Sequence, residues 1–217
     1  MSDSENINKE KTKEIAKLIK RVHDMGVNIG IVVGGGNFFR GRSHQDMEAI
    51  NADSMGMLGT TMNALALRDA FTKENIPNLV FSPFDFHELI EYHSEEELKK
   101  LYKEGTVIVF SGGTGHIGCS TDTAASMKAI MIGADVIIKL TNVDGVYDKD
   151  PKTSQDAKKY DSITIDEVIE KNLQVVDMTA SILARDNKMP MWVFGLNEEN
   201  SIVNTVNGKF TGTRVTV

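Results

Sequence analysis

The 217-residue chain has one cysteine, Cys119, and no long hydrophobic run. A single cysteine excludes an internal disulfide framework and is typical of proteins kept in a reducing cytosol. No apolar stretch approaches the ~20 residues that a membrane-spanning helix needs. The first residues, Ser2 to Asn6, are acidic and polar and do not resemble a signal peptide. Together these absences predict a cytoplasmic protein.

Positive charge is also scarce. The chain has 24 Lys and Arg against 31 Asp and Glu, a formal net charge of −7. Such a balance does not favour a surface for nucleic acids or anionic membranes. Any affinity for phosphate must therefore be local, built from loops and a few cations. With 41% hydrophobic and 25% charged residues, the composition is ordinary for a soluble globular protein.

A glycine-rich segment is the most informative feature that the chain does contain. The β-branched run Ile31–Val33 leads into three consecutive glycines, Gly34–Gly36, and Arg40 follows shortly after. Glycines let the backbone adopt special conformations and let its N–H groups approach a ligand closely. N–H groups beside a guanidinium form a phosphate site. One glycine would suffice for a simple turn, so three favour anion binding.

Helical and strand-like patterns alternate along the whole chain. We predict helices over residues 15–25, 55–71, 94–103, 121–132, 165–171, 178–187 and 202–206, and strands over 28–33, 78–82, 106–110, 134–140, 191–196 and 213–217. This alternation predicts a three-layer α/β/α sandwich around a mainly parallel sheet. No repeat or obvious linker interrupts it, so residues 1–217 are expected to form a single domain.

A second glycine-rich loop, residues 111–115, follows the strand predicted at 106–110 and leads into the helix at 121–132. Open α/β sheets bind ligands at the carboxyl ends of their strands, and helix N-termini favour anions. Two phosphate-type loops indicate two phosphorylated ligands, or one ligand with several phosphates. The pattern therefore points toward phosphoryl transfer.

Several motifs in one order resemble those of the bacterial uridylate (UMP) kinases of the amino-acid kinase superfamily. They are Gly34–Gly41, Asp53–Leu58, Asn63–Leu67, Gly113–Gly115, Ser120–Ala125, Thr141–Tyr147, Asp150–Pro151, Val176–Asp177 and Ala184–Asp186. Each match alone is weak, whereas the ordered set covers almost the whole chain and is highly specific.

The resemblance implies transfer of the γ-phosphoryl group from MgATP to UMP, with Mg²⁺ entering together with ATP. The residues it implies for UMP are Gly35, Asp53, Thr114, Gly115, His116, Ile117, Gly118, Cys119, Ser120 and Thr121. Those it implies for ATP are Gly36, Arg40, Thr141, Asn142, Tyr147 and Asp150. Gly36 and Arg40 are expected where the donor and acceptor phosphates meet.

Three residues are candidates for catalysis. Because the acceptor is already a phosphate oxygen, the reaction needs positioning and charge neutralisation rather than a strong base. Arg40 supplies a guanidinium fork, Asp122 is expected to orient cationic groups, and Asp177 to organise Mg²⁺ or the phosphates. The simpler alternatives are that Asp122 is only a helix cap and Tyr147 only a partly buried aromatic residue. The metal ligands themselves stay unassigned.

The chain departs from the family at its start. Family members begin with a strand that ends in Lys-x-Ser-Gly, whose lysine bridges the transferring phosphates, and this sequence lacks it. Because that strand is central in the family's sheet, its absence is expected to expose sheet edges and to lower both stability and activity. A misassigned start or a truncation would explain the difference.

Two further segments differ from the family. The usual Asn-Pro-aromatic segment of the UMP loop is His116-Ile117-Gly118-Cys119 here, which removes a rigid wall from the expected base pocket. Base selectivity is thereby open, with His116 either a replacement hydrogen-bond partner or a surface histidine. The segment Pro83–His93 carries no family feature, and its role stays unassigned.

Two functions therefore remain in view. The first is a UMP kinase, and the second is a nucleotide-binding protein that senses or holds nucleotides without turnover. A kinase of carbamate, acetylglutamate or aspartate ranks third, because Asp53–Met57 resembles the UMP branch. The resemblance also implies hexamers, GTP activation and UTP inhibition. The Met- and Leu-rich helix at 55–71 suits a subunit interface or the core equally well.

Overall fold

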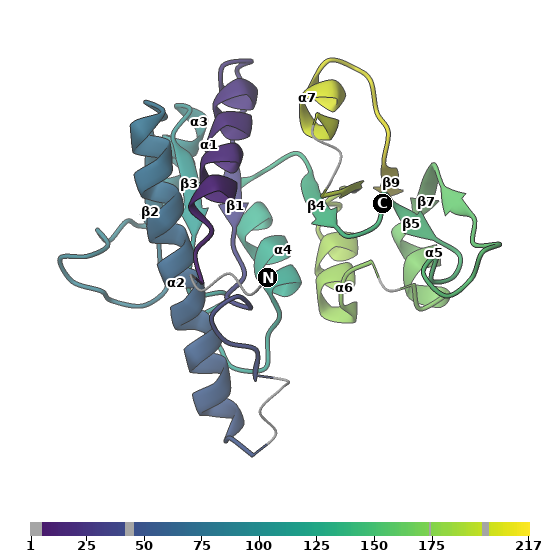
Figure 1. The fold of residues 1–217 in the computed structure, drawn as a ribbon, viewed down its shortest axis with the longest axis horizontal. Helices are drawn as coiled ribbons and strands as arrows, with labels where there is room; N and C mark the ends of the chain where they lie inside the picture. Colours follow the sequence, from purple (N-terminus) through teal and green to yellow (C-terminus); the bar gives the residue numbers. More distant parts are fainter. Residues whose placement is uncertain (1–5, 42–45, 174, 197–199) are drawn as a thin grey trace. The chain divides into compact units, whose positions relative to one another are not determined.

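The computed structural model describes residues 6–41, 46–173, 175–196 and 200–217. Its helices and strands, labelled in Figure 1, alternate as far as the fourth helix, after which four strands and then two helices follow in succession. The contacts divide the chain into two compact units, Met1–Ala124 and Ala125–Val217. Each unit is described separately below.

The first unit contains a parallel sheet. Its elements are α1 (Lys9–His23), β1 (Gly30–Val32), α2 (Ala49–Lys73), β2 (Asn78–Phe81), α3 (Glu95–Lys103) and β3 (Val107–Phe110). The sheet order is β1-β3-β2, and both pairings are parallel. The central strand β3 is buried at all four positions, as expected for a run of Val, Ile and Phe with neighbours on both sides. Both glycine-rich loops leave this sheet at the carboxyl ends of β1 and β3.

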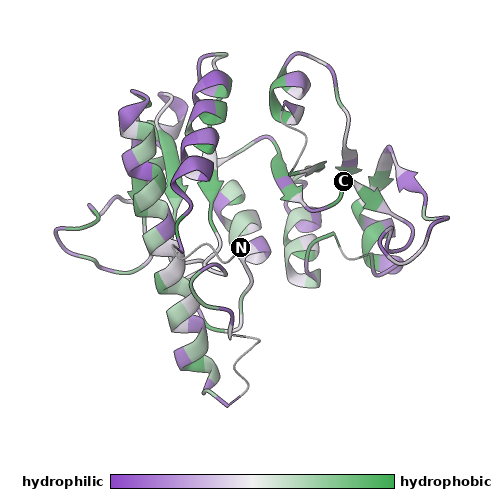
Figure 2. Ribbon diagram, viewed as in Figure 1, coloured by the Kyte–Doolittle hydropathy of each residue, from purple (hydrophilic) through white to green (hydrophobic). Residues whose placement is uncertain are grey.

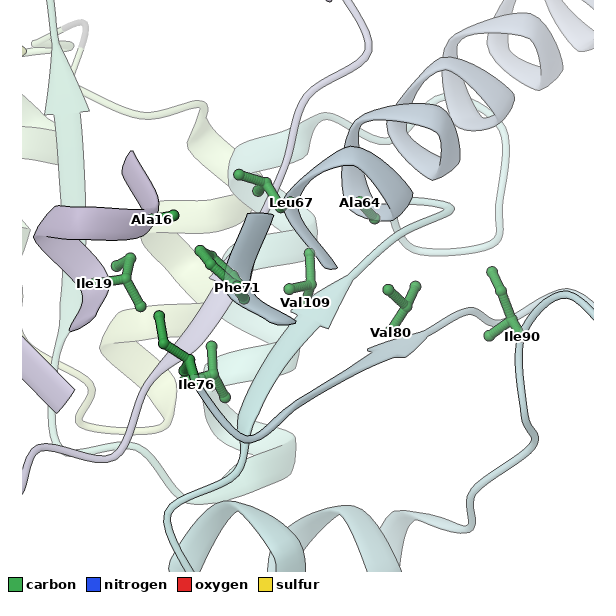
Figure 3. Close-up of a cluster of buried hydrophobic side chains, with 10 residues drawn as sticks. Ala16, Ile19, Ala64, Leu67, Phe71, Ile76, Val80, Ile90 and Val109 are labelled. Carbon is green, nitrogen blue, oxygen red and sulfur yellow. The ribbon is translucent and has the colours of Figure 1, made fainter. Parts of the chain in front are cut away.

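The core of the first unit lies between α1, α2 and the sheet. Figure 3 shows Phe71 of α2 close to Val109 of β3, with Ala16 and Ile19 of α1 nearby. Figure 2 shows α1 as a largely hydrophilic helix, whose few apolar residues face this cluster. The full set of buried residues in the cluster is Ala16, Ile19, Ala64, Leu67, Phe71, Ile76, Val80, Ile90, Val107 and Val109.

Local sequence signals account for several helix ends in this unit. Ser94 accepts a hydrogen bond from the Glu97 backbone N–H, and the Glu97 carboxylate accepts one from the Ser94 backbone, so a capping box begins α3. Gly26 adopts a φ of +81° three residues after α1 ends. Helix α2, in contrast, begins at Ala49, six residues before the predicted start. Asp53 therefore lies on the helix rather than before it.

The second unit contains a mixed sheet and a small hairpin. Its elements are most of α4 (Thr121–Ile132), β4 (Ile137–Thr141), β5 (Val146–Tyr147), β6 (Lys159–Tyr160), β7 (Ser162–Thr164), α5 (Ile165–Glu170), α6 (Met178–Asp186), β8 (Met191–Gly195), α7 (Ser201–Val206) and β9 (Thr213–Thr216). The sheet order is β4-β8-β9-β7, in which only β8 and β9 are antiparallel. Strands β5 and β6 pair antiparallel with Tyr147 opposite Lys159.

Thr213 ties the hairpin to the sheet of this unit. Its side chain is fully buried, accepts a hydrogen bond from the Val146 backbone N–H at 2.9 Å, and donates one to the Tyr160 carbonyl. One hydroxyl on β9 therefore contacts both strands of the hairpin. A separate cluster, which includes Ile163, Val168, Ala184, Met191 and Val215, forms the apolar core here.

The predicted fold class, α/β with parallel sheets, is confirmed by this arrangement and by the matching structures reported below. The three short strands β5, β6 and β7 were not predicted, because runs of two or three residues carry no detectable periodicity. That residues 1–217 form one domain stays a prediction.

Candidate active site

The first glycine-rich loop takes its shape from close contact with α2. A Cβ atom at Gly35 would lie 2.2 Å from the Gly56 carbonyl oxygen, and one at Gly59 would lie 3.0 Å from the Gly35 carbonyl oxygen. None of Gly34, Gly35 and Gly36 has a positive φ. These glycines therefore serve close backbone approach between loop and helix, rather than a left-handed conformation.

A reciprocal pair of amides fastens the same loop to α2. Asn63 donates to Asn37 Oδ1 at 2.7 Å and to the Gly34 carbonyl at 2.7 Å, and Asn37 donates back to Asn63 Oδ1 at 3.0 Å. Asn37 also donates to the Asn6 carbonyl at 2.7 Å. The loop thus has side-chain anchors on both sides of its glycines.

Arg40 folds back over the glycines that precede it. Its Nε donates to the Gly36 carbonyl at 3.1 Å, and a Cβ at Gly36 would lie 3.4 Å from the guanidinium carbon. Arg40 is exposed. The structure therefore brings Gly36 and Arg40 together, as predicted for a phosphate site that combines a backbone loop with a guanidinium.

The second glycine-rich loop uses the conformational freedom of glycine directly. Gly112 and Gly113 have φ values of +69° and +59°. The Gly112 N–H donates to Thr60 Oγ1 of α2 at 2.7 Å, which fixes the base of the loop. A Cβ at Gly112 would lie 2.8 Å from the Pro83 ring and 3.0 Å from the Phe84 ring. Pro83 and Phe84 therefore back this loop, which gives part of the unassigned segment 83–93 a structural role.

Asp53 meets the expected UMP loop. Its carboxylate accepts a hydrogen bond from the Gly118 backbone N–H, with Asp53 Oδ2 and Gly118 N 2.6 Å apart. The neighbouring residues His116, Ile117 and Cys119 are exposed, whereas Thr114 is buried and exchanges hydrogen bonds with the His116 backbone. The structure thus brings together Asp53 and the loop that were both predicted to contact UMP.

Ser120, rather than Thr121 or Asp122, caps helix α4. Its hydroxyl accepts a hydrogen bond from the Thr123 backbone N–H at 3.0 Å. Asp122 lies in the first turn, where a carboxylate is favoured by the helix dipole. The simple alternative that Asp122 is the N-cap residue is therefore wrong, and its role in catalysis stays a prediction.

The second unit has a pocket beside the turn after β4. Its volume is about 380 Å³, and its lining includes Asn142, Val143, Asp144, Tyr147, Pro151, Lys152, Gly195 and Leu196. Two of these, Asn142 and Tyr147, were predicted to bind ATP. Thr141 ends β4 one residue before this lining begins, and the Asp150 carboxylate accepts a hydrogen bond from the Lys152 backbone at 2.9 Å.

Asp144 is the polar centre of this pocket wall. Tyr147 Oη donates to its Oδ1 at 2.6 Å, and Lys159 Nζ donates to its Oδ2 at 2.9 Å. The Tyr147 hydrogen bond, assisted by Lys159, holds the pKa of the Asp144 carboxyl below its ordinary value. The same hydrogen bond raises the pKa of the Tyr147 phenol.

Asp177 caps α6 in the second unit, because its Oδ1 accepts a hydrogen bond from the Ala180 backbone N–H at 3.0 Å. This cap is a structural role that the sequence analysis did not assign to it. The predicted role of Asp177 with Mg²⁺ or phosphate stays a prediction.

Sequence reasoning missed three residues that shape these sites. Thr60 holds the second glycine-rich loop, Asp144 was included only within the Thr141–Tyr147 motif, and Lys159 was not singled out. Lys159 lies in a run of polar residues whose two-residue strand leaves no sequence signal. Thr60 lies between the recognised motifs Asp53–Leu58 and Asn63–Leu67, and its contact with Gly112 on a distant loop leaves no signal in the sequence.

Two broader searches covered the residues that the structure describes. Within these ranges no helix is both long and apolar enough to cross a membrane. In the same part of the chain, no group of three or more His, Cys, Asp or Glu side chains is arranged to hold a metal ion.

A parallel α/β sheet with glycine-rich loops at its strand ends, together with a polar pocket, is typical of enzymes that bind phosphorylated ligands. The sequence profile of the amino acid kinase family matches residues 2–195 of this chain. The chain belongs to the amino acid kinase family.

Within that family, the chain is similar to uridylate kinases. It is 46% identical to the uridylate kinase of Psychrobacter sp. (strain PRwf-1) over 194 residues, which cover 88% of this chain and 80% of that protein. The crystal structure of UMP kinase from Ureaplasma parvum matches with a TM-score of 0.94 and 34% identity, covering 100% of this chain and 93% of that one. The UMP kinase structure from Bacillus anthracis matches with a TM-score of 0.95 and 31% identity, covering 99% and 90%. The resemblance found in the motifs is confirmed.

Proposed function

We propose that this chain transfers the γ-phosphoryl group of MgATP to UMP, giving UDP and ADP. The observation that carries the proposal is 46% identity to a uridylate kinase over 88% of the chain. The chain is accordingly a nucleoside monophosphate kinase.

We assign the acceptor to the first unit. Asp53 is the proposed partner of the ribose hydroxyls, since carboxylate oxygens accept hydrogen bonds from hydroxyl groups. Gly35 and the loop from Thr114 to Thr121 are proposed to surround the phosphate and base. The exposure of His116, Ile117 and Cys119 supports this assignment, because a ligand can reach them.

We assign the nucleoside part of the donor to the pocket of the second unit. Asn142 and Tyr147 line it, and Thr141 and Asp150 adjoin it in the chain. A volume of about 380 Å³ falls in the range of small-molecule sites, which supports a nucleoside as occupant.

Arg40 is the proposed electrostatic catalyst. The transferred phosphoryl group spreads negative charge over its oxygens, and a planar guanidinium can hold two of them at once. Gly36 lies under this guanidinium and is proposed to offer its backbone to the same phosphates. No general base is needed, because the attacking UMP phosphate oxygen is already ionised near neutral pH.

The donor set fits Mg²⁺ carried by ATP. Mg²⁺ keeps several waters and takes one or two carboxylates together with phosphate oxygens, so a dedicated cluster of acidic residues is not required. Asp177 is the carboxylate proposed to organise the ion or the phosphates, and Asp122 is proposed to orient cationic groups. When bound, the ion neutralises charge on the phosphates.

The proposed ligands are UMP and ATP as substrates and GTP and UTP as regulators, and a homohexamer is the proposed assembly. Support for assembly comes from α2, where Ile50, Leu58 and Met62 are 54%, 53% and 49% exposed. Side chains of this size on one helix surface favour contact with another protein surface.

A coupled assay for ADP release tests the proposed reaction. We expect turnover with ATP and UMP that is slow, because the Lys-x-Ser-Gly lysine is absent, and that stops when EDTA removes Mg²⁺. We expect none with carbamate, acetylglutamate or aspartate as acceptor. Binding of both nucleotides without turnover would instead identify a nucleotide-holding protein. Binding of neither would contradict the proposal.

A further inference from the structure

The Lys159 ammonium of β6 is fully engaged inside the second unit. Its Nζ donates to Asp144 Oδ2 at 2.9 Å, to the Asp144 carbonyl at 3.2 Å and to the Thr211 carbonyl at 3.0 Å. A lysine ammonium has three protons and no acceptor, so these three partners use its whole capacity. Lys159 is therefore placed as a tie between chain segments rather than as a cation directed at a ligand.

The segment that Lys159 ties is the wall of the pocket. Asp144 and Tyr147 both line it, and Tyr147 donates to the Asp144 carboxylate at 2.6 Å. Tyr147 and Lys159 are directly paired across the β5–β6 hairpin. The carboxylate of Asp144 thus receives the phenol on one oxygen and the ammonium on the other.

The backbone beneath this tie leaves no room for a side chain at Gly145 and little at Gly195. A Cβ at Gly145 would lie 2.5 Å from Thr213 Oγ1 and 3.0 Å from the Lys159 side chain, and one at Gly195 would lie 3.3 Å from Asp144 Cα. The turn therefore lies closely between β8, β9 and the lysine stem. The Asp144 and Lys159 side chains are 46% and 25% exposed, so their attraction is partly screened, and the geometry of the tie matters more than its charge.

We propose that Lys159 is a positioning residue of the donor-nucleotide pocket: by holding Asp144 from two sides, it fixes the Tyr147 ring and the turn 142–147 in the form that receives the nucleoside. The proposal rests on the proposed function, since it takes this pocket as the ATP site. Lys159 itself does not touch the nucleotide. Its effect passes through Asp144 to Tyr147.

The test uses the full chain and Lys159→Met, which keeps the lysine stem and removes the ammonium. The matched control is Lys158→Met, an equal change of charge at the preceding residue, whose side chain is exposed. Calorimetry measures the affinity for MgATP and for UMP separately, and thermal melting measures stability. We expect Lys159→Met to weaken MgATP binding about tenfold, equivalent to about 1.4 kcal/mol, with UMP affinity unchanged.

A double-mutant cycle with Tyr147→Phe connects the effect to the ring. Alone, this variant removes one hydrogen bond and should weaken MgATP binding about threefold. If Tyr147 and Lys159 act through one network, the double variant should lose less MgATP affinity than the sum of the losses in the two single variants. Tyr147→Phe also serves as the test should Lys159→Met fail to fold, because the phenylalanine keeps the ring.

The outcomes separate the two claims. A wild type that binds neither nucleotide contradicts the proposed function, and the inference falls with it. A wild type that binds both, with unchanged MgATP affinity in Lys159→Met or, failing that, in Tyr147→Phe, overturns the inference alone. So does a variant whose melting temperature falls while both affinities stay as in the wild type, because Lys159 is then only structural.

Discussion

The Asp53 carboxylate on α2 holds the backbone of Gly118, with 2.6 Å between Asp53 Oδ2 and Gly118 N. The two residues are 65 positions apart in the sequence. If the same carboxylate receives the ribose hydroxyls, as proposed, the sugar must share or replace this contact. Asp53 then both recognises the ligand and sets the position of the loop that encloses it.

Replacing Asp53 by Ala should weaken UMP binding by roughly 1.5–3 kcal/mol, the range for hydrogen bonds to a charged group. The variant loses the acceptor for ribose and frees Gly118. Titration calorimetry measures the change, and Asp69→Ala on the same helix is the control, because Asp69 only pairs with Lys73 on the exposed surface. Unchanged UMP affinity in Asp53→Ala would remove Asp53 from the site.

Arg40→Lys should chiefly lower kcat. Lysine keeps the charge but loses the planar fork that grips two oxygens, and it loses the Nε donor to the Gly36 carbonyl. Removing such a preorganised group costs about 10²–10³ in rate. Steady-state kinetics with both substrates make the test, with Arg68→Lys as the control. If only KM for UMP rose, Arg40 would be a binding contact and its catalytic role wrong.

Asn63→Ala should loosen the first glycine-rich loop. The change removes three hydrogen bonds: the two that Asn63 donates to Asn37 Oδ1 and to the Gly34 carbonyl, both at 2.7 Å, and the one that it accepts from Asn37 at 3.0 Å. We expect a loss of about 1–3 kcal/mol in the free energy of unfolding and slower phosphoryl transfer. Denaturant unfolding measures the first and the coupled assay the second. Asn51→Ala, an exposed asparagine on the same helix, is the control and should change neither.

Tyr147→Phe should raise the pKa of Asp144 toward its ordinary value of 3.8, because the phenol's hydrogen bond is the main cause of its lowering. A carboxyl whose pKa is lowered in the folded state stabilises the protein above its unfolded pKa. That stabilisation is lost as pH falls through the folded pKa. The difference in melting temperature between wild type and Tyr147→Phe should therefore be full at pH 6 and shrink below about pH 4.

The carboxyl titration can be followed directly by NMR of the Asp144 side chain. Conversion of Tyr160, which is paired with Val146 in the same hairpin, to Phe provides a matched loss of a phenol. An Asp144 titration midpoint that is the same in wild type and Tyr147→Phe would contradict the prediction.

Most of the fold could be predicted from the sequence because the strongest patterns are local. The Ser94–Glu97 capping box, the buried strand β3 and the bounds of α4 need only neighbouring residues to be recognised. The start of α2 was placed too late, because Ile50 is the one large apolar residue in the segment 49–54, which therefore shows no apolar repeat. The helical form there is stabilised by the contact of Asp53 with Gly118 and by the close approach of Gly56 and Gly59 to Gly35.

Only part of the candidate site could be predicted from the sequence. The glycine-rich loops and Asp53 belong to motifs that occur in the family's order, so the sequence predicted that they contribute to one site. The Lys159–Asp144 tie joins positions 15 residues apart through a hairpin of two-residue strands, and no local pattern marks such a pair. The sequence also did not show why residue 35 is a glycine, because the Gly56 carbonyl that excludes a side chain there belongs to α2.

Because Gly35 has no positive φ and packs closely against α2, the loop Gly34–Gly36 is only as ordered as the first half of that helix. Helix ends open locally at a lower free energy than the sheet they cover. Warming should therefore release the Gly34–Gly36 segment before β1 and β3 separate. Amide hydrogen exchange would show this as an early loss of protection at residues 49–59. The proposed binding of phosphate would then be lost at a temperature at which the core is still folded.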